Sequence, residues 1–182
     1  MHIVDLNPGE DRAIEQTARL LLEAFRDDTP GWPDMASTRE EVRASFASNR
    51  LSRVAREDDG TVVGWIGGIS GYRGRVWEIH PLAVRPDRQR QGIGRALLND
   101  LEDQVCKQGG LTLWLGTDDE NDRTSLGGID LFPDPLSHLR SIRNTGGHPY
   151  EFYMRCGFVL AGVVPDANGF GKPDILLAKR VV

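Results

Sequence analysis

Hydrophobic residues recur at helical spacing in the first part of the chain. Between residues 11 and 25 they fall on one side of a helix, at Ile14, Ala18, Leu21, Leu22 and Phe25. The spacing predicts a first helix over 11–25, with Asn7 as its cap and Pro8 tolerated in a first turn. A shorter helix is expected after the Pro- and Asp-rich stretch 27–34. Its capping box is either Ser37 with Glu40 or Thr38 with Glu41.

The next segments alternate as strands do. Residues 51–56 and 61–71 flank the turn Asp58-Asp59-Gly60 and predict a hairpin, which 76–84 continues as a third strand. The pair Gly67-Gly68 indicates a bulge or a close backbone approach within the second of these strands.

A long helix is expected from about 95 to the glycines at 109–110, and a short buried strand at 111–116 follows it. Residues 117–148 show no strand pattern and are rich in aspartate, with a helix expected at 135–143. A loop of this length is usually functional or disordered. A short helix at 149–156 and strands at 158–164 and 174–179 complete the prediction.

This order of elements predicts an α/β protein of the α+β type. No change in composition marks a linker in the 182 residues, so we expect a single domain over 1–182 with a substrate lid inserted at 117–148.

Composition and charge exclude several classes of function. The net charge of −5 argues against nucleic-acid binding and mildly favours a cationic substrate. No apolar run is long enough to span a membrane, and the first residues do not resemble a secretory signal, so we expect a cytoplasmic protein. Cys106 and Cys156 are expected to be free thiols, and the four histidines show no zinc spacing, so no metal is predicted.

The most informative segment is Gln89-Arg-Gln-Gly-Ile-Gly94, which lies between a strand and a helix. A glycine turn at a helix N-terminus directs backbone N–H groups at one point, where the helix dipole favours phosphate. The loop lacks the Lys-Ser or Lys-Thr of a nucleotide triphosphate loop. Leu97 stands where a dinucleotide fingerprint has its third glycine.

The residues that remain, Gln89, Gly92 and Gly94, resemble the acetyl-CoA pyrophosphate loop of the GCN5-related N-acetyltransferase (GNAT) family. Glu78 before the loop and Tyr153-Met-Arg-Cys-Gly157-Phe158 late in the chain also resemble that family. The resemblance implies a mixed, mostly antiparallel sheet flanked by helices. It also implies acetyl-CoA as cosubstrate and a homodimer, since relatives commonly dimerise.

The resemblance also implies site residues. Glu78 is the candidate general base, with His80 as an alternative or a relay through water, and Tyr153 is the candidate general acid. The pantetheine and pyrophosphate groups are expected to bind at Leu82, Ala83, Val84, Gln89, Arg90, Gln91, Gly92, Ile93, Gly94 and Arg95.

The acceptor is a harder question, because the family acetylates many kinds of amine. Acidic residues after the strand at 111–116 and in the lid suggest a negative pocket for a cation. The expected acceptor site consists of Trp32, Glu78, Asp118, Asp119 and Asp134. The segments 115–121, 148–153 and 165–174 resemble those of aminoglycoside 6′-N-acetyltransferases, which implies transfer to an aminoglycoside amine in a ternary complex.

Two alternatives remain open. The first is a family member for another cationic amine, such as a polyamine or a protein N-terminus. The second is a non-catalytic acyl-CoA sensor, against which the presence of both Glu78 and Tyr153 counts.

Overall fold

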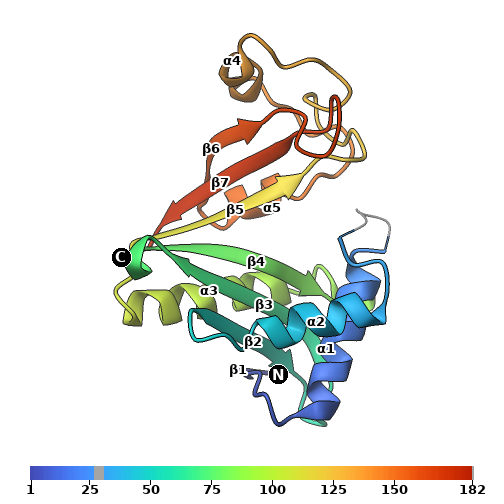
Figure 1. The fold of residues 1–182 in the computed structure, drawn as a ribbon, viewed down its shortest axis with the longest axis vertical. Helices are drawn as coiled ribbons and strands as arrows, with labels where there is room; N and C mark the ends of the chain where they lie inside the picture. Colours follow the sequence, from blue (N-terminus) through green and yellow to red (C-terminus); the bar gives the residue numbers. More distant parts are fainter. Residues whose placement is uncertain (27–30, 182) are drawn as a thin grey trace. The chain divides into compact units, whose positions relative to one another are not determined.

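The computed structural model describes residues 1–26 and 31–181 and divides into two compact units (Figure 1). Unit 1 is Met1–Leu111 with Val181, and unit 2 is Thr112–Arg180. Every strand pair within each unit is antiparallel, and helices pack on the strands. The predicted α/β class is therefore confirmed.

Unit 1 contains four antiparallel strands in the order β1-β2-β3-β4. They are β1 (His2–Asp5), β2 (Arg50–Arg56), β3 (Val62–Gly71) and β4 (Val76–Val84). The predicted hairpin and third strand correspond to β2, β3 and β4. The first strand, β1, was missed, because it is only four residues long and mostly exposed.

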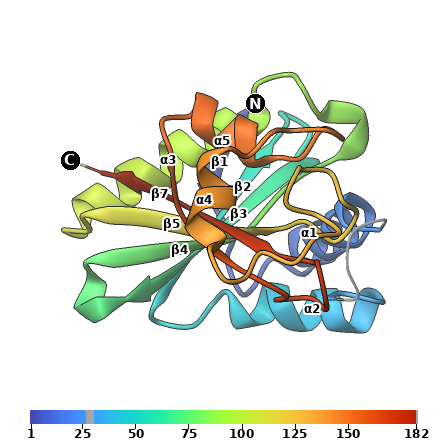
Figure 2. The same ribbon diagram turned by 90° about the horizontal axis from the view of Figure 1, so that it is seen from above.

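Three α-helices belong to unit 1: α1 (Asp11–Ala24), α2 (Met35–Ala44) and α3 (Ile93–Lys107). Alternation along β3 separates the faces that they cover. Trp65 is fully buried in the cluster that includes α1, whereas a Cβ on Gly64 would meet Leu97 and Ile93 of α3. Helices α1 and α3 therefore lie on opposite faces of the strands, as Figure 2 shows from above. Short 3₁₀ turns, η1 (Tyr72–Gly74) and η2 (Pro86–Arg88), follow β3 and β4.

Helix α1 starts at Asp11 as predicted, but the predicted caps of the first two helices were wrong. Helix α1 has Glu10 at its N-cap without a side-chain cap, and Asn7 instead donates through its backbone and side chain to the Glu10 carboxylate. Helix α2 begins earlier than predicted. Its cap is Asp34, whose carboxylate accepts from the N–H groups of Ala36 and Ser37 at 2.9 and 2.8 Å. Part of the stretch 27–34 lies outside the described residues.

Unit 2 contains β5 (Thr112–Asp118), β6 (Val159–Val164) and β7 (Asp174–Arg180), with β7 in the middle. Two six-residue helices, α4 (Pro135–Arg140) and α5 (Tyr150–Arg155), complete it. Strand β5 continues past the predicted end at 116, so Asp118 is its last residue. Helix α4 stops three residues before the predicted end at 143.

Leucine side chains form the interior of unit 2, where Leu113, Leu126, Leu131 and Leu177 are almost completely buried. Segment 119–148 thus contributes two of these leucines, and it also forms an isolated bridge between Thr124 and Asn144. The long loop therefore contributes to the interior of unit 2 and has backbone pairing of its own.

Candidate functional site

The loop between β4 and α3 has a defined backbone. Arg90 and Gly92 have φ values of 60° and 86°, so the chain turns twice through the left-handed region before the helix starts. The side chain of Gln89 donates to the Val84 carbonyl at 3.2 Å, and that of Gln91 donates to the Asp87 carbonyl at 3.4 Å. Both glutamines thus stabilise the loop itself.

The start of α3 presents backbone donors. Ala96 is the first residue whose N–H bonds back along the helix, to the Gly92 carbonyl at 3.0 Å. The preceding N–H groups, of Ile93, Gly94 and Arg95, have no earlier helical carbonyl to reach. Arg95 and Arg90 are exposed. These amides, the dipole of a fifteen-residue helix and two guanidinium groups give the loop the donors and positive potential that a bound anion would need.

Strand β4 presents two different faces. Trp77, Ile79, Pro81 and Ala83 are buried, whereas Glu78, His80, Leu82 and Val84 are partly exposed. Up to His80 this is the alternation expected from the sequence, and it places Glu78 and His80 on one face. Leu82 and Val84 were expected to fill the core with their side chains, but both are only partly buried. Ile79 pairs with Gly68 and Val84 with Gly64, and both glycines face α3, so Leu82 and Val84 lie on the α3 side of the strand and Glu78 on the other.

A β-bulge lies at the middle of β4. Ile66 pairs with Leu82 and Gly68 with Ile79, so Gly67 alone stands opposite His80 and Pro81. A Cβ at Gly67 would come within 2.2 Å of the His80 carbonyl oxygen. The bulge predicted at Gly67-Gly68 is confirmed, and it sets the direction of the residues around His80.

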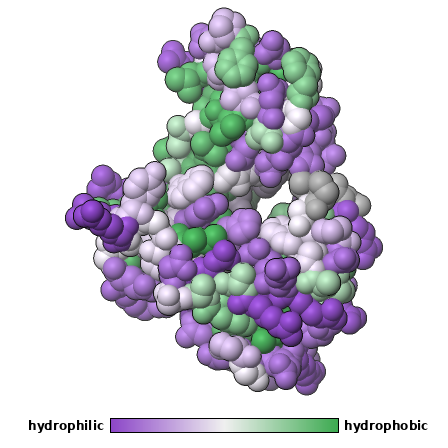
Figure 3. Space-filling view, in the orientation of Figure 1, coloured by the Kyte–Doolittle hydropathy of each residue, from purple (hydrophilic) through white to green (hydrophobic). Residues whose placement is uncertain are grey.

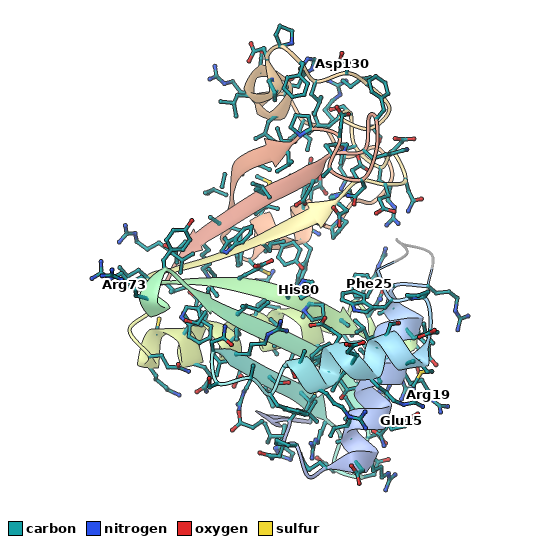
Figure 4. All side chains as sticks on the ribbon, viewed as in Figure 1. Glu15, Arg19, Phe25, Arg73, His80 and Asp130 are labelled. Atoms are coloured by element: carbon teal, nitrogen blue, oxygen red, sulfur yellow. The ribbon has the colours of Figure 1, made fainter. Side chains whose placement is uncertain are left out.

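The Trp32 ring lies beside His80 within unit 1. The Trp32 ring lies 5.7 Å from the His80 ring and 5.2 Å from that of Phe25, measured between centroids. Figure 4 shows His80 and Phe25 beside α2. The His80 Nε2 lies 3.9 Å from a carboxylate oxygen of Glu41, which also accepts from Arg50 at 3.0 Å. Unit 1 thus brings Trp32, a residue of the expected acceptor site, beside His80, the alternative candidate for the base.

The contact of Glu41 with His80 was missed from the sequence. Glu41 matched a capping box and was assigned to the start of a helix. It lies instead near the end of α2, because the helix begins at Met35. No sequence signal gives the side of the helix from which it reaches β4.

The remaining predicted residues belong to unit 2. Asp118 is exposed at the end of β5, and its carboxylate accepts from the side chain of Asn168. Asp134 caps α4, accepting from the Ser137 N–H at 3.2 Å, which gives it a structural role whether or not it meets a substrate.

Asp119 lies inside the loop. Its two carboxylate oxygens accept from the N–H of Arg123 at 2.6 Å, the N–H of Thr124 at 2.9 Å and the Thr124 hydroxyl at 2.7 Å. The side chain is almost completely buried. A carboxylate engaged by three internal donors stabilises its own loop, which argues against direct contact with an acceptor amine.

Tyr153 lies on α5, with its ring 5.1 Å from Phe152 and 5.8 Å from Phe158 between centroids. Burial raises the pKa of its phenol above the usual range, and the nearby Cys156 thiol adds to the rise. Tyr153 is therefore protonated at neutral pH, as a proton donor must be.

Cys106 and Cys156 are free thiols, as predicted. Within 1–26 and 31–181 no group of three potential ligands is placed to hold a metal ion. No helix in the same ranges is long and apolar enough to cross a membrane.

The start of α3 offers backbone donors, and the neighbouring β4 carries a carboxylate and an imidazole. Such an arrangement suits a phosphate-bearing cosubstrate. Residues 15–125 match the model of the acetyltransferase (GNAT) family. The chain belongs to this family.

Solved structures of similar sequence cover the whole chain. An aminoglycoside 6′-N-acetyltransferase complexed with coenzyme A is 36% identical, with a TM-score of 0.92 over 100% of this chain and 98% of that one. The aminoglycoside 6′-N-acetyltransferase from Enterococcus faecium is 37% identical, with a TM-score of 0.90 over the same shares.

Curated relatives match over shorter segments. The mycobacterial N-alpha-acetyltransferase RimI, from Mycobacterium tuberculosis, is 36% identical over 110 residues, which are 58% of this chain and 64% of that protein. The [ribosomal protein bS18]-alanine N-acetyltransferase of Escherichia coli K12 is 62% identical over 34 residues. That match spans 19% of this chain and about a quarter (23%) of the relative's length.

Proposed function

We propose that the protein transfers the acetyl group of acetyl-CoA to an amine of an aminoglycoside, most specifically the 6′ amine. The observation that carries this proposal is the likeness to aminoglycoside 6′-N-acetyltransferases over the entire chain, at 36% and 37% identity. The likeness includes unit 2, where members of one family with different acceptors are expected to differ.

The β4–α3 loop suits acetyl-CoA. Its diphosphate needs several backbone donors and a positive potential, which the amides at 93–95 and the exposed Arg90 and Arg95 supply. The backbone of Leu82, Ala83 and Val84 is proposed to pair with the pantetheine arm. When bound, acetyl-CoA supplies an activated acyl group, so no covalent enzyme intermediate is required.

Proton transfer is assigned to residues of both units. An ammonium group must lose a proton before its nitrogen attacks, and Glu78 is proposed to accept it directly or through His80. Tyr153 is proposed to donate a proton to the departing thiolate. Because burial raises the Tyr153 pKa, the phenol is a weak acid, and we expect its contribution at the lower end of the usual range.

Acceptor recognition is proposed to use Trp32 and Glu78 in unit 1 and Asp118 and Asp134 in unit 2. Aminoglycosides carry several ammonium groups, which carboxylates and an aromatic face both attract. Glu41 is added to this set because its carboxylate lies beside His80. Segment 117–148 is proposed to form the acceptor side of the protein.

A protein N-terminus is the second candidate acceptor. It is favoured by the 62% identity over 34 residues to the Escherichia coli enzyme that acetylates an alanine of bS18. That match covers too little of the chain to include unit 2 as a whole, so it supports the shared coenzyme chemistry more than a shared acceptor.

We also propose a cytoplasmic homodimer. Figure 3 shows apolar residues over β6 and next to α4. Val159, Leu136 and Phe132 are 63%, 63% and 59% exposed, and β6 has a neighbour within unit 2 only on its β7 side. A second copy would cover this surface.

A substrate comparison tests the proposed function. Acetyl-CoA consumption is measured with kanamycin, with a matched analogue bearing a hydroxyl at the 6′ position, with a polyamine and with a peptide that begins with alanine. We expect turnover with kanamycin and little with the analogue. Faster turnover with the peptide or the polyamine would show that this amine, and not the aminoglycoside, is the acceptor.

Variants test the proposed proton transfers. Glu78→Gln is expected to lower kcat by about 10²–10⁴-fold, and Tyr153→Phe by about 10²-fold. Asp118→Asn should raise the KM for the aminoglycoside more than it lowers kcat. Near-normal rates in folded Glu78→Gln protein would remove Glu78 from the mechanism.

A further inference from the structure

Side chains hold the main chain of segment 119–148 near both of its ends. At the start, Asp119 holds the backbone of Arg123 and Thr124. At the end, the side-chain amide of Asn144 makes two hydrogen bonds to the His148 backbone. Its Nδ2 donates to the His148 carbonyl, and its Oδ1 accepts from the His148 N–H, each at 2.8 Å. These contacts fix the main chain of His148 immediately before α5.

The His148 ring continues this connection in two directions. Its Nε2 lies 3.1 Å from the backbone oxygen of Asp118, at the end of β5. Its Nδ1 accepts from the backbone N–H of Tyr150, the first residue of α5, at 3.2 Å. Only a neutral ring protonated at Nε2 satisfies both contacts, because the Tyr150 N–H needs an unprotonated nitrogen.

The surroundings of His148 favour that neutral form. His148 is only 3% exposed, and this burial lowers the pKa of its ring. The charged groups around it are Asp118, Asp119 and Arg123. The two carboxylates partly oppose the effect of burial, and Arg123 adds to it. At neutral pH His148 is therefore an uncharged group with one donor and one acceptor.

Helix α5 depends on this acceptor. It has six residues, and its N-cap is Pro149, which makes no side-chain hydrogen bond to the helix. A helix this short has little stability of its own, so the contacts at its start determine its position. The acceptor for its first N–H is the His148 ring, and Tyr153 lies one turn further along.

We propose that His148 is a positioning residue that joins the end of β5 to α5 and thereby holds Tyr153 in place for proton transfer. This inference rests on the proposed acetyl transfer. The prediction from sequence did not include His148, because a buried histidine before a proline shows no pattern that distinguishes it from a packing residue.

Two substitutions of His148 separate positioning from packing. His148→Gln keeps one N–H donor and one oxygen acceptor in a neutral side chain, whereas His148→Leu fills similar space with neither. We expect kcat to fall by about 10- to 100-fold in His148→Leu, as for a displaced catalytic group, and to recover largely in His148→Gln. The KM for acetyl-CoA should change little in either.

The effect should pass through Tyr153. In a Tyr153→Phe background, His148→Leu is expected to lower kcat by less than about threefold, because the group that it positions is already absent. Full multiplication of the two effects would contradict the proposal. Equal losses in His148→Leu and His148→Gln would reduce His148 to a packing residue.

Amide hydrogen exchange tests the same role without an acceptor. The Tyr150 N–H should lose protection in His148→Leu and keep it in His148→Gln. Leu139→Ala, which opens a cavity elsewhere in unit 2, is the matched control: it should lower Tm without exposing the Tyr150 N–H. Unchanged exchange in His148→Leu would overturn the positioning role. Wild-type protein that acetylates no amine would instead overturn the proposed function.

Discussion

Replacing Gly67 by alanine tests whether the β-bulge beside His80 is required. The new Cβ would lie 2.2 Å from the His80 carbonyl oxygen and 3.1 Å from its carbon. An ordinary carbon–oxygen contact is about 3.3 Å or longer, so β3 and β4 must part by roughly 1 Å. The obstacle is backbone rather than a flexible side chain, and no rotamer change relieves it.

Overpacking of this kind costs about 1–3 kcal/mol, and a backbone clash belongs at the upper end. At about 2–4 °C per kcal/mol for a chain of this size, Gly67→Ala should lower Tm by about 6–12 °C. Thermal unfolding followed by circular dichroism measures this change. Because Glu78 and His80 lie on the displaced strand, kcat should fall as well.

Gly9→Ala is the matched control, since no atom lies within 4 Å of its added Cβ and its φ is ordinary. It should leave Tm unchanged or raise it slightly. If Gly67→Ala unfolds within 1–2 °C of the wild-type protein, roughly the effect of 0.5 kcal/mol, the close approach of β3 to β4 is wrong.

Other predictions concern caps, ion pairs and pH. Asp34→Ala removes the cap of α2 and should cost about 0.5–2 kcal/mol, seen as a lower urea midpoint. Arg53 is almost buried and donates to the Asp100 carboxylate at 2.6 and 2.9 Å. Arg53→Met should lower the free energy of unfolding by about 3 kcal/mol, because it leaves the Asp100 charge unpaired, and adding Asp100→Leu should recover part of that loss. Burial lowers the His148 pKa, so below about pH 6.5 the unfolded chain takes up a proton more readily than the folded one. The Tm should therefore decline as the pH falls below about 6.5, and His148→Gln should reduce this decline.

The sequence predicted those elements that have a clear hydrophobic periodicity or are marked by glycines. Strand β4 was clear because apolar and polar residues alternate from Trp77 to His80, before the bulge. The bulge was clear because Gly67-Gly68 interrupts a strand. Helix starts were less clear, since a cap depends on which polar residue the backbone reaches, and Asp34 was available three residues before the predicted Ser37.

The site was predictable as far as local motifs reach. The loop after β4 needs only residues close in sequence, and its glycine turn has the expected left-handed geometry at Gly92. The contact of Glu41 with His80 spans 39 positions of the chain. His148 contacts Asp118 across 30 positions and Tyr150 across 2. Such contacts follow from packing, and no spacing rule specifies them.

Asp119 shows the opposite error. An aspartate-rich stretch predicts negative surface, but one of its carboxylates turned inward to satisfy backbone donors of its own loop. Composition cannot distinguish the two fates, because both use the same residue type.

Backbone amides at the start of α3 are proposed to bind the diphosphate of coenzyme A. Backbone NMR signals recorded during a titration with coenzyme A test it most directly, with pantetheine, which lacks the diphosphate, as the control ligand. We expect the NMR signals of the amides of residues 91–95 to shift most with coenzyme A and hardly at all with pantetheine. Binding of coenzyme A that leaves these amides unshifted would contradict it.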